Sequence, residues 1–510
     1  MRFGHFDDIP VFYLTWYTKR YSLWVYRTVY RSLSFVNDNN SRGDKKMQEA
    51  YRNIVQENTL DWFENGVLYH IYPLGMLGCE RRNDGGVVRH RLPELIGLVA
   101  HLQALGVSAV YLGPLFESST HGYDTKDYFH IDRRLGDDED FKVLVRAYHE
   151  AGIRVIVDGV FNHVGKEFWG YREVMEYRDM ARTRYWFKGL RFDGRARDGV
   201  RYETWEGHDE LVKLDLDNDG ARGHLLDAVS YWIREFGIDG IRLDAADCLS
   251  QNFIRALRSH VESIRTDFLL VGEVIHGDYR TWANSEMMHG TTNYEAYKGL
   301  WSSHHDGNFH EIAYSLNRQF GPAGIYRDLS MYSFVDNHDV DRVVHKLKSP
   351  LSLYSLYALM FFMPGTPSIY YGSEWGILGQ KGHGYDADVP LRPSISVSDL
   401  SVGHLRQTME GVSLEHAIRR FSQVRRANSA LCIGSYRQIE VQAQWLAFER
   451  SIDCESVYCI VSDMPVNSPV TLSVPPGRYR DILNDEEVET SGGCLRVEAY
   501  AHWARVFVRC

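Results

Sequence analysis

Carboxylic acids close four apolar segments of the chain. These residues are Asp158, Asp244, Glu273 and Asp336, and Asp339 stands just beyond the last. Aspartate and glutamate serve enzymes as nucleophiles and as general acids and bases. If the segments are parallel barrel strands, their carboxyl ends meet on one face and bring the acids together. A single aspartate after a strand is often a turn former, and Asp336 taken alone fits that description equally well.

Arg242 and Asp244 lie two residues apart in the segment Gly240–Asp244. In a strand they share one face, while the residue between them points the other way. We expect the arginine to favour the ionised carboxylate and lower its pKa, which suits a nucleophile. Glu273 follows an apolar run, and we expect burial to raise its pKa, which suits a general acid.

Two carboxylic acids held in different protonation states are the groups of a retaining glycosidase. One forms a covalent glycosyl-enzyme, while the other protonates the leaving oxygen. Because the transition state resembles an oxocarbenium ion, a third anion stabilises it, and Asp339 is the natural candidate. His163 and His338 follow the third and seventh expected strands and can donate hydrogen bonds to sugar hydroxyls.

The segments that position these residues alternate between short apolar runs and helical patterns. This rhythm is typical of a parallel α/β sheet, and eight strands fit a closed (β/α)8 TIM barrel better than a doubly wound sheet. The expected strands are Val67–Tyr72, Ala109–Leu112, Val155–Asp158, Gly240–Asp244, Leu269–Glu273, Thr292–Tyr294, Ser333–Asp336 and Ser368–Tyr371. The expected helices include Leu92–Leu105, Phe141–Ala151, Ala221–Phe236 and Leu353–Phe362.

The chain divides further outside the barrel pattern. We expect residues 1–60 to form an N-terminal extension and linker, and residues 61–430 to form the catalytic barrel. The interval 165–219 after the third strand is the widest, so we expect a small inserted domain there. Alternating strands predict a C-terminal antiparallel β-sandwich-like domain over 431–510. Those strands are expected at Val457–Val461, Val470–Val474, Leu495–Glu498 and Arg505–Val508.

The composition excludes several classes of protein. Apolar residues make up 44% and charged residues 25% of the chain, which is ordinary for a soluble globular protein. The net charge of −11 argues against nucleic-acid binding, which requires clustered Lys and Arg. The apolar run Leu356–Pro364 is far below the ~18 residues of a membrane span. Seven cysteines without C-x-x-C spacing favour a reducing compartment, so we expect a cytoplasmic protein.

Four short segments resemble, in order, the signature regions of the α-amylase family, glycoside hydrolase family 13. They are Asp158–His163, Gly240–Asp244, Gly272–Val274 and Phe334–Asp339. The resemblance implies a retaining glycosidase with Asp244 as nucleophile, Glu273 as acid/base and Asp339 as transition-state stabiliser. Leu211–Asp215 is similar to an extra signature seen near cyclomaltodextrinases and neopullulanases. The implied substrates are maltooligosaccharides or related α-glucans, as for cyclomaltodextrinase/neopullulanase-like and α-glucosidase-like members.

The same resemblance implies further contacts with the sugar. Tyr123 would stack on the sugar whose bond is cleaved. Asp124 and Arg392 resemble a pair that some exo-acting members use near the non-reducing sugar. The full set of expected substrate-binding residues is Tyr123, Asp124, His163, Arg242, His338 and Arg392.

The chain departs from the family at one calcium ligand. Many endo-acting members continue the second signature with Lys-His, whereas Asp247 and Cys248 stand here. That histidine helps to hold calcium in those enzymes, and Asn162 is the ligand that this chain keeps. We therefore expect no required cofactor, and Asn162 is the residue at which a calcium ion would bind.

Two other functions stay open. A transglycosylase, either an α-glucanotransferase or a sugar isomerase-like enzyme, uses the same covalent intermediate but passes the glycosyl group to a sugar. A non-catalytic binding or transporter-associated relative would lose a catalytic carboxylate or carry a membrane span, and this chain keeps Asp244, Glu273 and Asp339. The sequence predicts neither a preference between α-1,4 and α-1,6 bonds nor an oligomeric state.

Overall fold

The structure, a computed structural model, describes residues 60–510 except 197, 385, 398–407 and 410–411. The expected N-terminal extension, residues 1–60, lies outside the described residues apart from Leu60. Residues Thr59–Cys510 form one compact unit, so the expected boundary near residue 430 stays a prediction.

Eight parallel strands close into a barrel, which confirms the expected fold class. Their order around the barrel is β1-β13-β12-β11-β10-β9-β3-β2. The strands are β1 (Leu68–Ile71), β2 (Ala109–Leu112), β3 (Arg154–Gly159), β9 (Gly240–Leu243), β10 (Leu269–Gly272), β11 (Gly290–Thr292), β12 (Ser330–Phe334) and β13 (Thr366–Tyr370). The register places Arg242 on β9 opposite Asp158 on β3 and opposite Val271 on β10.

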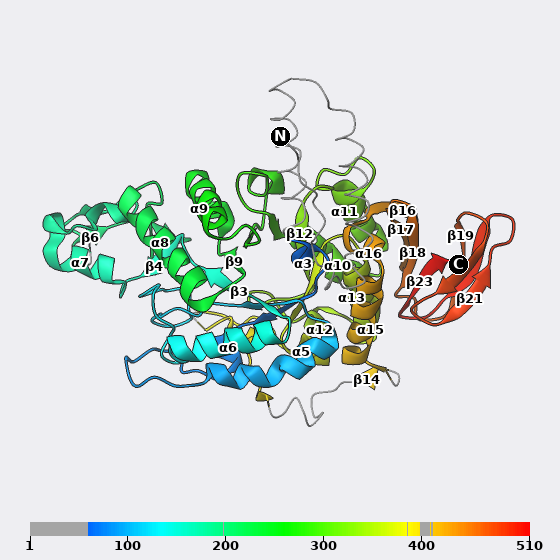
Figure 1. The fold of residues 1–510 in the computed structure, drawn as a ribbon, viewed down its shortest axis with the longest axis horizontal. Helices are drawn as coiled ribbons and strands as arrows, with labels where there is room; N and C mark the ends of the chain where they lie inside the picture. Colours follow the sequence, from blue (N-terminus) through cyan, green and yellow to red (C-terminus); the bar gives the residue numbers. More distant parts are fainter. Residues whose placement is uncertain (1–59, 197, 385, 398–407, 410–411) are drawn as a thin grey trace, which may run out of the picture. The chain divides into compact units, whose positions relative to one another are not determined.

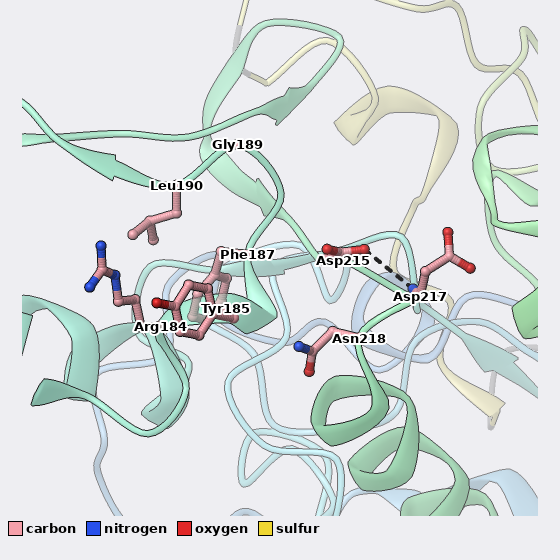
Figure 2. A pocket seen from close by; sticks show the side chains of 8 residues that line it. All are labelled: Arg184, Tyr185, Phe187, Gly189, Leu190, Asp215, Asp217 and Asn218. Carbon is pink, nitrogen blue, oxygen red and sulfur yellow. Dashed lines mark hydrogen bonds between the residues drawn. The ribbon is translucent and has the colours of Figure 1, made fainter. Parts of the chain in front are cut away.

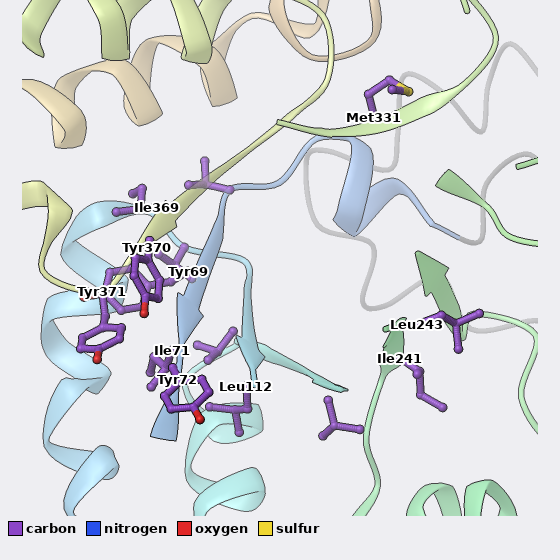
Figure 3. Close-up of a cluster of buried hydrophobic side chains, with 14 of the residues drawn as sticks. Tyr69, Ile71, Tyr72, Leu112, Ile241, Leu243, Met331, Ile369, Tyr370 and Tyr371 are labelled. Carbon is purple, nitrogen blue, oxygen red and sulfur yellow. The ribbon is translucent and has the colours of Figure 1, made fainter. Parts of the chain in front are cut away.

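Barrel strands are buried on both faces, which explains why their sequences are continuous apolar runs. Alternate residues of one strand belong to different buried clusters. Leu68 on β1 and Tyr111 on β2 belong to a small cluster with residues of the facing strands. Their neighbours Tyr69 and Leu112 belong to the large cluster that includes the helices (Figure 3).

Helices follow the strands around the barrel (Figure 1). They are α5 (Val99–Leu105), α6 (Asp138–Glu150), α8 (Asp219–Tyr231), α9 (Gln251–Ile264), α10 (Tyr294–Asp306), α11 (Phe309–Phe320), α13 (Ser352–Phe362) and α15 (Leu414–Ala427). Shorter helices are α3 (Asp61–Glu64), α4 (Pro73–Met76), α12 (Val343–Lys346) and α16 (Ser429–Ile433). The expected helix Leu92–Leu105 begins as a 3₁₀ helix over Leu92–Leu98, which has Pro93 near its start.

The sixth barrel strand lies earlier than the sequence predicted. We expected Thr292–Tyr294, but β11 ends at Thr292 and Tyr294 begins α10. The reason is a helix cap, because the Asn293 side chain accepts a hydrogen bond from the Ala296 N–H at 3.0 Å. The cap brings Tyr294 to the carboxyl end of the barrel strands.

The long interval between β3 and β9 holds its own small elements, drawn in cyan to green in Figure 1. They are β4 (His163–Gly165), α7 (Trp169–Tyr177), β5 (Arg191–Phe192), β6 (Val200–Arg201), β7 (Thr204–Trp205) and β8 (His208–Lys213). Strands β4, β8 and β7 form an antiparallel sheet. This sheet places Trp205 beside His163, the first residue of β4, with ring centroids 5.6 Å apart.

The C-terminal part is antiparallel, as expected. A six-stranded sheet has the order β16-β17-β18-β23-β20-β21, and β19 pairs with β22. The strands are β16 (Ser435–Gln442), β17 (Trp445–Ile452), β18 (Glu455–Ser462), β19 (Ser468–Ser473), β20 (Arg478–Asp481), β21 (Glu486–Glu489), β22 (Cys494–Ala499) and β23 (Trp503–Arg509). A further pair, β14 (Thr408–Met409) and β15 (Val412–Ser413), precedes α15.

A buried arginine joins this sheet to the barrel helices. The guanidinium of Arg450 donates to the carbonyls of Phe362 and Leu431, both at 2.9 Å, and to Gly434 at 2.8 Å. Burial and the nearby charge of Arg425 lower the pKa of Arg450 to about 9. The contacts satisfy carbonyls at the ends of α13 and α16, where no further helical N–H follows.

Candidate active site

Arg242 is the centre of a cluster of three carboxylates. Its Nη1 lies 2.8 Å from Asp158 Oδ1 and 3.0 Å from Asp244 Oδ1, and its Nη2 lies 2.8 Å from Glu273 Oε2. The strand register explains the grouping, because Arg242 lies between β3 and β10. All four residues are more than nine-tenths buried. The planar guanidinium therefore fixes the two carboxylates that the sequence assigned to catalysis next to each other.

Glu273 receives hydrogen bonds on both oxygens. Oε2 accepts from the Ala245 N–H at 3.1 Å in addition to Arg242, and Oε1 accepts from the Tyr294 hydroxyl at 3.1 Å. Ala245 has φ of 42°, a left-handed conformation that is rare for residues other than glycine. This conformation directly precedes the short helix Ala246–Cys248 and accompanies the contact between the Ala245 N–H and Glu273. Local backbone strain is thus found at the carboxylate cluster.

The protonation of Asp244 differs from the expectation. Burial raises the pKa of Asp244 well above its ordinary value; Arg242 opposes the shift, and the charge of Glu273 adds to it. Arg242 does lower this pKa, as expected, but burial outweighs it, so the expectation of a net lowering is wrong. The cluster therefore keeps a proton at a pH at which a free aspartate has lost it.

Asp339 is held as an anion. Its Oδ2 lies 3.0 Å from His338 Nε2 and its Oδ1 lies 3.0 Å from Arg392 Nη2. Burial opposes ionisation, but His338 and Arg392 outweigh it and lower the pKa of Asp339 below its ordinary value. A permanent negative charge beside the other carboxylates suits the stabilisation of a cationic transition state.

Stacked aromatic rings form one wall of the site. His338 lies between Tyr123, with ring centroids 5.6 Å apart and planes at 10°, and Tyr72, at 5.8 Å and 16°. The Tyr123 hydroxyl also contacts His338 Nε2 and donates to Asp158 Oδ2 at 3.0 Å. The guanidinium of Arg392 covers Tyr72 at 4.5 Å from the ring centroid. The structure thus brings Tyr123, His338 and Arg392 together as neighbours of the carboxylates.

His163 lies on the side of the inserted elements. Its Nδ1 is 3.1 Å from Asn162 Nδ2, and its Nε2 is buried without a hydrogen-bond partner among the described residues. Burial, aided by His121, lowers the pKa of His163 to about 3, so the ring is neutral near pH 7. A neutral imidazole with an unpaired nitrogen can bind a sugar hydroxyl.

Asp124 and Arg392 have separate partners in the described part of the chain. The Asp124 carboxylate accepts from the Thr120 N–H at 3.0 Å and the Thr120 hydroxyl at 2.7 Å. Arg392 pairs instead with Asp339 and with Asp388 at 3.2 Å. The expected joint contact of Asp124 and Arg392 with a sugar stays a prediction.

Asp336 lies apart from the carboxylate cluster around Arg242. Its carboxylate accepts from the Ser373 hydroxyl at 2.8 and 2.9 Å and from the Val343 N–H at 2.8 Å. Burial raises its pKa, and these donors oppose the shift. Asp336 could be read from the sequence as a catalytic acid or as a local structural residue, and these hydrogen bonds favour the structural role.

The surroundings of Asn162 are a poor fit for calcium. Asn162 lines a cavity of about 210 Å³ together with two carboxylates and two lysines, which are Asp215, Asp217, Lys188 and Lys213. Calcium prefers several anionic or carbonyl oxygens, whereas two ammonium groups here offset the charge of the two carboxylates.

A larger cavity of about 510 Å³ opens in the inserted elements (Figure 2). Asp215, Asp217 and Asn218 line it opposite Tyr185, and the Asp217 N–H donates to Asp215 Oδ1 at 3.3 Å. The expected catalytic and sugar-binding residues are absent from the lining of this cavity. It is therefore distinct from the carboxylate cluster.

Comparison with known proteins decides the family. Residues 91–430 match the model of the α-amylase catalytic domain. The chain belongs to the α-amylase family. A cyclomaltodextrinase from Bacillus sp. is 30% identical to this family member over 437 residues, covering 79% of this chain and 73% of that protein. Neopullulanase 2 from Thermoactinomyces vulgaris is 29% identical, covering 86% of this chain and 77% of that protein.

Solved structures of other α-amylase-family proteins share the fold. A cyclomaltodextrinase superposes with a TM-score of 0.76 at 26% identity, covering 88% of this chain and 78% of that chain. A cyclic α-maltosyl-(1→6)-maltose hydrolase from Arthrobacter globiformis, solved with cyclic α-maltosyl-(1→6)-maltose, has a TM-score of 0.71 at 27% identity, with 88% and 99% coverage. In the described residues of this α-amylase-family chain, we find no helix with the length and apolarity to cross a membrane.

Three aromatic residues of this α-amylase-family site were not identified from the sequence. Tyr72 directly follows β1, Tyr294 follows β11, and Trp205 reaches the site from the insertion. The position after a barrel strand, which identified the carboxylates, also marks Tyr72 and Tyr294. Trp205 has no comparable signal, because its place depends on the pairing of β7 with β8.

Proposed function

We propose that this enzyme hydrolyses α-glucosidic bonds of maltooligosaccharides or related α-glucans with retention of configuration. The observation that carries the proposal is the contact of Asp244 and Glu273 with the two terminal nitrogens of one guanidinium, that of Arg242. A retaining mechanism needs two carboxylates close enough to act on one glycosidic bond, about 5–5.5 Å apart.

The first step forms the covalent intermediate. A carboxylate oxygen of Asp244 attacks the anomeric carbon, and the bond from this carbon to the glycosidic oxygen breaks. Glu273 gives its proton to the departing oxygen. The buried cluster holds a proton, and this step requires that proton on Glu273 while Asp244 is ionised. The contact with Arg242 favours the negative charge on Asp244.

The second step returns the enzyme to its starting state. Glu273 takes a proton from water, whose oxygen attacks the same anomeric carbon and releases Asp244 as a carboxylate. Asp339, held ionised by His338 and Arg392, stabilises the positive charge that develops on the sugar in both steps. Tyr123 would stack on the sugar, and His163 and His338 would bind its hydroxyls.

Relatives support this substrate class. Similar proteins are named cyclomaltodextrinase, neopullulanase and intracellular maltogenic amylase. One similar structure contains a cyclic maltosyl-maltose. A cytoplasmic location is part of the proposal, supported by the free thiols of all seven cysteines and by the relative named as intracellular.

A product time course tests the proposal. The enzyme is incubated with maltoheptaose, cyclodextrin, pullulan, isomaltose and sucrose, beside Asp244→Asn and Glu273→Gln variants. We expect wild-type to release short α-configured sugars and both variants to lose turnover while keeping the wild-type melting temperature. Longer oligosaccharides accumulating at high sugar concentration would instead support the transglycosylase. Near-native turnover by either variant would contradict the assignment.

A further inference from the structure

The two oxygens of Glu273 have partners of different chemistry. Oε2 faces the Arg242 guanidinium at 2.8 Å and the Ala245 N–H at 3.1 Å, and both groups can only donate. Oε1 faces the Tyr294 hydroxyl at 3.1 Å, which can donate or accept. A proton on Oε2 would meet two donors, so the acid proton belongs on Oε1.

The Tyr294 hydroxyl is itself oriented by Asn337. The Asn337 amide nitrogen donates to this hydroxyl at 3.2 Å. The amide cannot be turned over without cost, because Asn337 Oδ1 accepts the N–H groups of Asp339 at 2.8 Å and Val340 at 3.2 Å. With Asn337 donating to its oxygen, the phenol proton is left to point at Oε1 of Glu273.

Other charged groups around Glu273 come from the neighbouring strands. They are Arg242 and Asp244 from the end of β9, Asp158 on β3 and Asp339 beyond β12. Tyr294 stays neutral, since burial and the charges of Glu273 and Asp339 raise its pKa well above the ordinary value. Unlike these charged groups, Tyr294 is a neutral donor, and it donates to Oε1 of Glu273.

We infer that Tyr294 is a positioning residue for the acid/base step, and that Asn337 aligns it from the loop that also carries Asp339. Arg242 and the Ala245 N–H exclude the acid proton from Oε2, while the Tyr294 hydroxyl fixes the orientation of Oε1 toward the leaving oxygen and stabilises the carboxylate after the proton has left. The inference rests on the proposed function. Asp339 is also linked to Glu273 through three hydrogen bonds, from the Asp339 N–H to Asn337, from Asn337 to Tyr294 and from Tyr294 to Glu273.

The variant Tyr294→Phe tests the inference because it keeps the ring and removes the hydroxyl. Loss of a donor to the carboxylate favours the protonated acid, so the basic limb of the kcat/KM profile is expected to move up by about one pH unit. Without alignment, kcat/KM on maltotriose is expected to fall about ten-fold. On an aryl maltoside with a good leaving group, which needs little protonation, the loss is expected to stay below two-fold.

Tyr297→Phe is the matched control. Tyr297 lies one turn along the same helix, α10, and its ring packs on Phe334 at 5.0 Å. We expect it to retain the wild-type basic limb. Equal losses on both substrates with an unmoved basic limb in Tyr294→Phe would overturn the inference. A failure of the proposed function is a different result, since wild-type enzyme would then turn over neither substrate.

Discussion

Asp158 and Arg242 lie opposite each other on neighbouring strands, with 2.8 Å between Asp158 Oδ1 and Arg242 Nη1. This ion pair orients the guanidinium so that its nitrogens also reach Asp244 and Glu273. Tyr111 and Tyr123 donate to the other oxygen of Asp158, at 2.9 and 3.0 Å. The barrel register thus sets the geometry on which the proposed chemistry depends.

Arg242→Lys is expected to impair catalysis far more than folding. A lysine keeps the charge but cannot bridge several carboxylates with a planar fork. We expect kcat to fall about 100-fold or more, a loss typical of misplaced electrostatic groups. Steady-state kinetics on maltotriose and thermal unfolding of the same samples check this. Equal losses of folded protein and of activity would assign Arg242 a purely structural role.

Tyr123→Phe and Tyr123→Ala separate two contributions of one residue. The phenylalanine keeps the ring stacked on His338 and loses the hydrogen bonds to Asp158 and His338. The alanine loses both. We expect kcat/KM to fall about ten-fold for the first variant and at least a further ten-fold for the second, since an aromatic contact contributes on the order of 1 kcal/mol beyond its buried area. Equal kcat/KM values for the two variants would show that the stacked ring of Tyr123 contributes nothing to catalysis.

The position of a carboxylate at a strand end could be predicted from sequence, but its protonation could not. Parallel strands bring their ends together whatever lies between them, which is why Asp244, Glu273 and Asp339 were found. The pKa of Asp244 is raised first by burial and then by the charges of Glu273 and Asp158, against Arg242, and these surroundings follow from the pairing of β3, β9 and β10. Local patterns do not contain that pairing.

Tyr294 was missed for a related reason. The stretch Thr292–Tyr294 resembles the end of a strand, whereas the Asn293 cap begins a helix within it. Asp336 was left open between two interpretations by the sequence. It stands in the same kind of position as the proposed catalytic acids, yet its carboxylate accepts hydrogen bonds from Ser373 and the Val343 N–H.

His101 lies between two glutamates, so we expect the free energy of unfolding to depend on pH. His101 Nε2 lies 2.8 Å from Glu374, and Nδ1 lies 3.6 Å from Glu415. Burial opposes protonation, but the two glutamates outweigh it and raise the pKa of His101 to about 9. Because the folded pKa exceeds the unfolded value of about 6.5, this stabilisation is fully present below pH 6.5 and is lost as pH rises through 9.

His101→Gln should therefore be less stable than wild-type at pH 6, by on the order of 3 kcal/mol, with a gap that narrows toward pH 10. Urea unfolding at several pH values measures the gap. His130→Gln is the control, because His130 is exposed on the surface beside Asp127. A gap that does not change with pH would show that the charge of His101 contributes nothing.

Arg450→Met should destabilise the fold. The change leaves the carbonyls of Phe362, Leu431 and Gly434 buried without this donor. We expect the free energy of unfolding to fall by about 3 kcal/mol. Arg437→Met removes an exposed arginine paired with Glu449 and should cost less than about 1 kcal/mol. Similar denaturation midpoints for the two variants would contradict this role of Arg450.

Asp244 is proposed to form a covalent bond to the sugar, and chemical trapping of that bond is the most direct test of this role. Wild-type enzyme is treated with a 5-fluoro-α-glucosyl fluoride, whose electron-poor ring slows breakdown of the intermediate, and the digested protein is analysed by mass spectrometry. We expect one added glycosyl mass on the peptide that contains Asp244, absent from the Asp244→Asn variant. A glycosyl mass on another residue, or unlabelled enzyme that releases inverted sugar, would contradict the role of Asp244 as nucleophile.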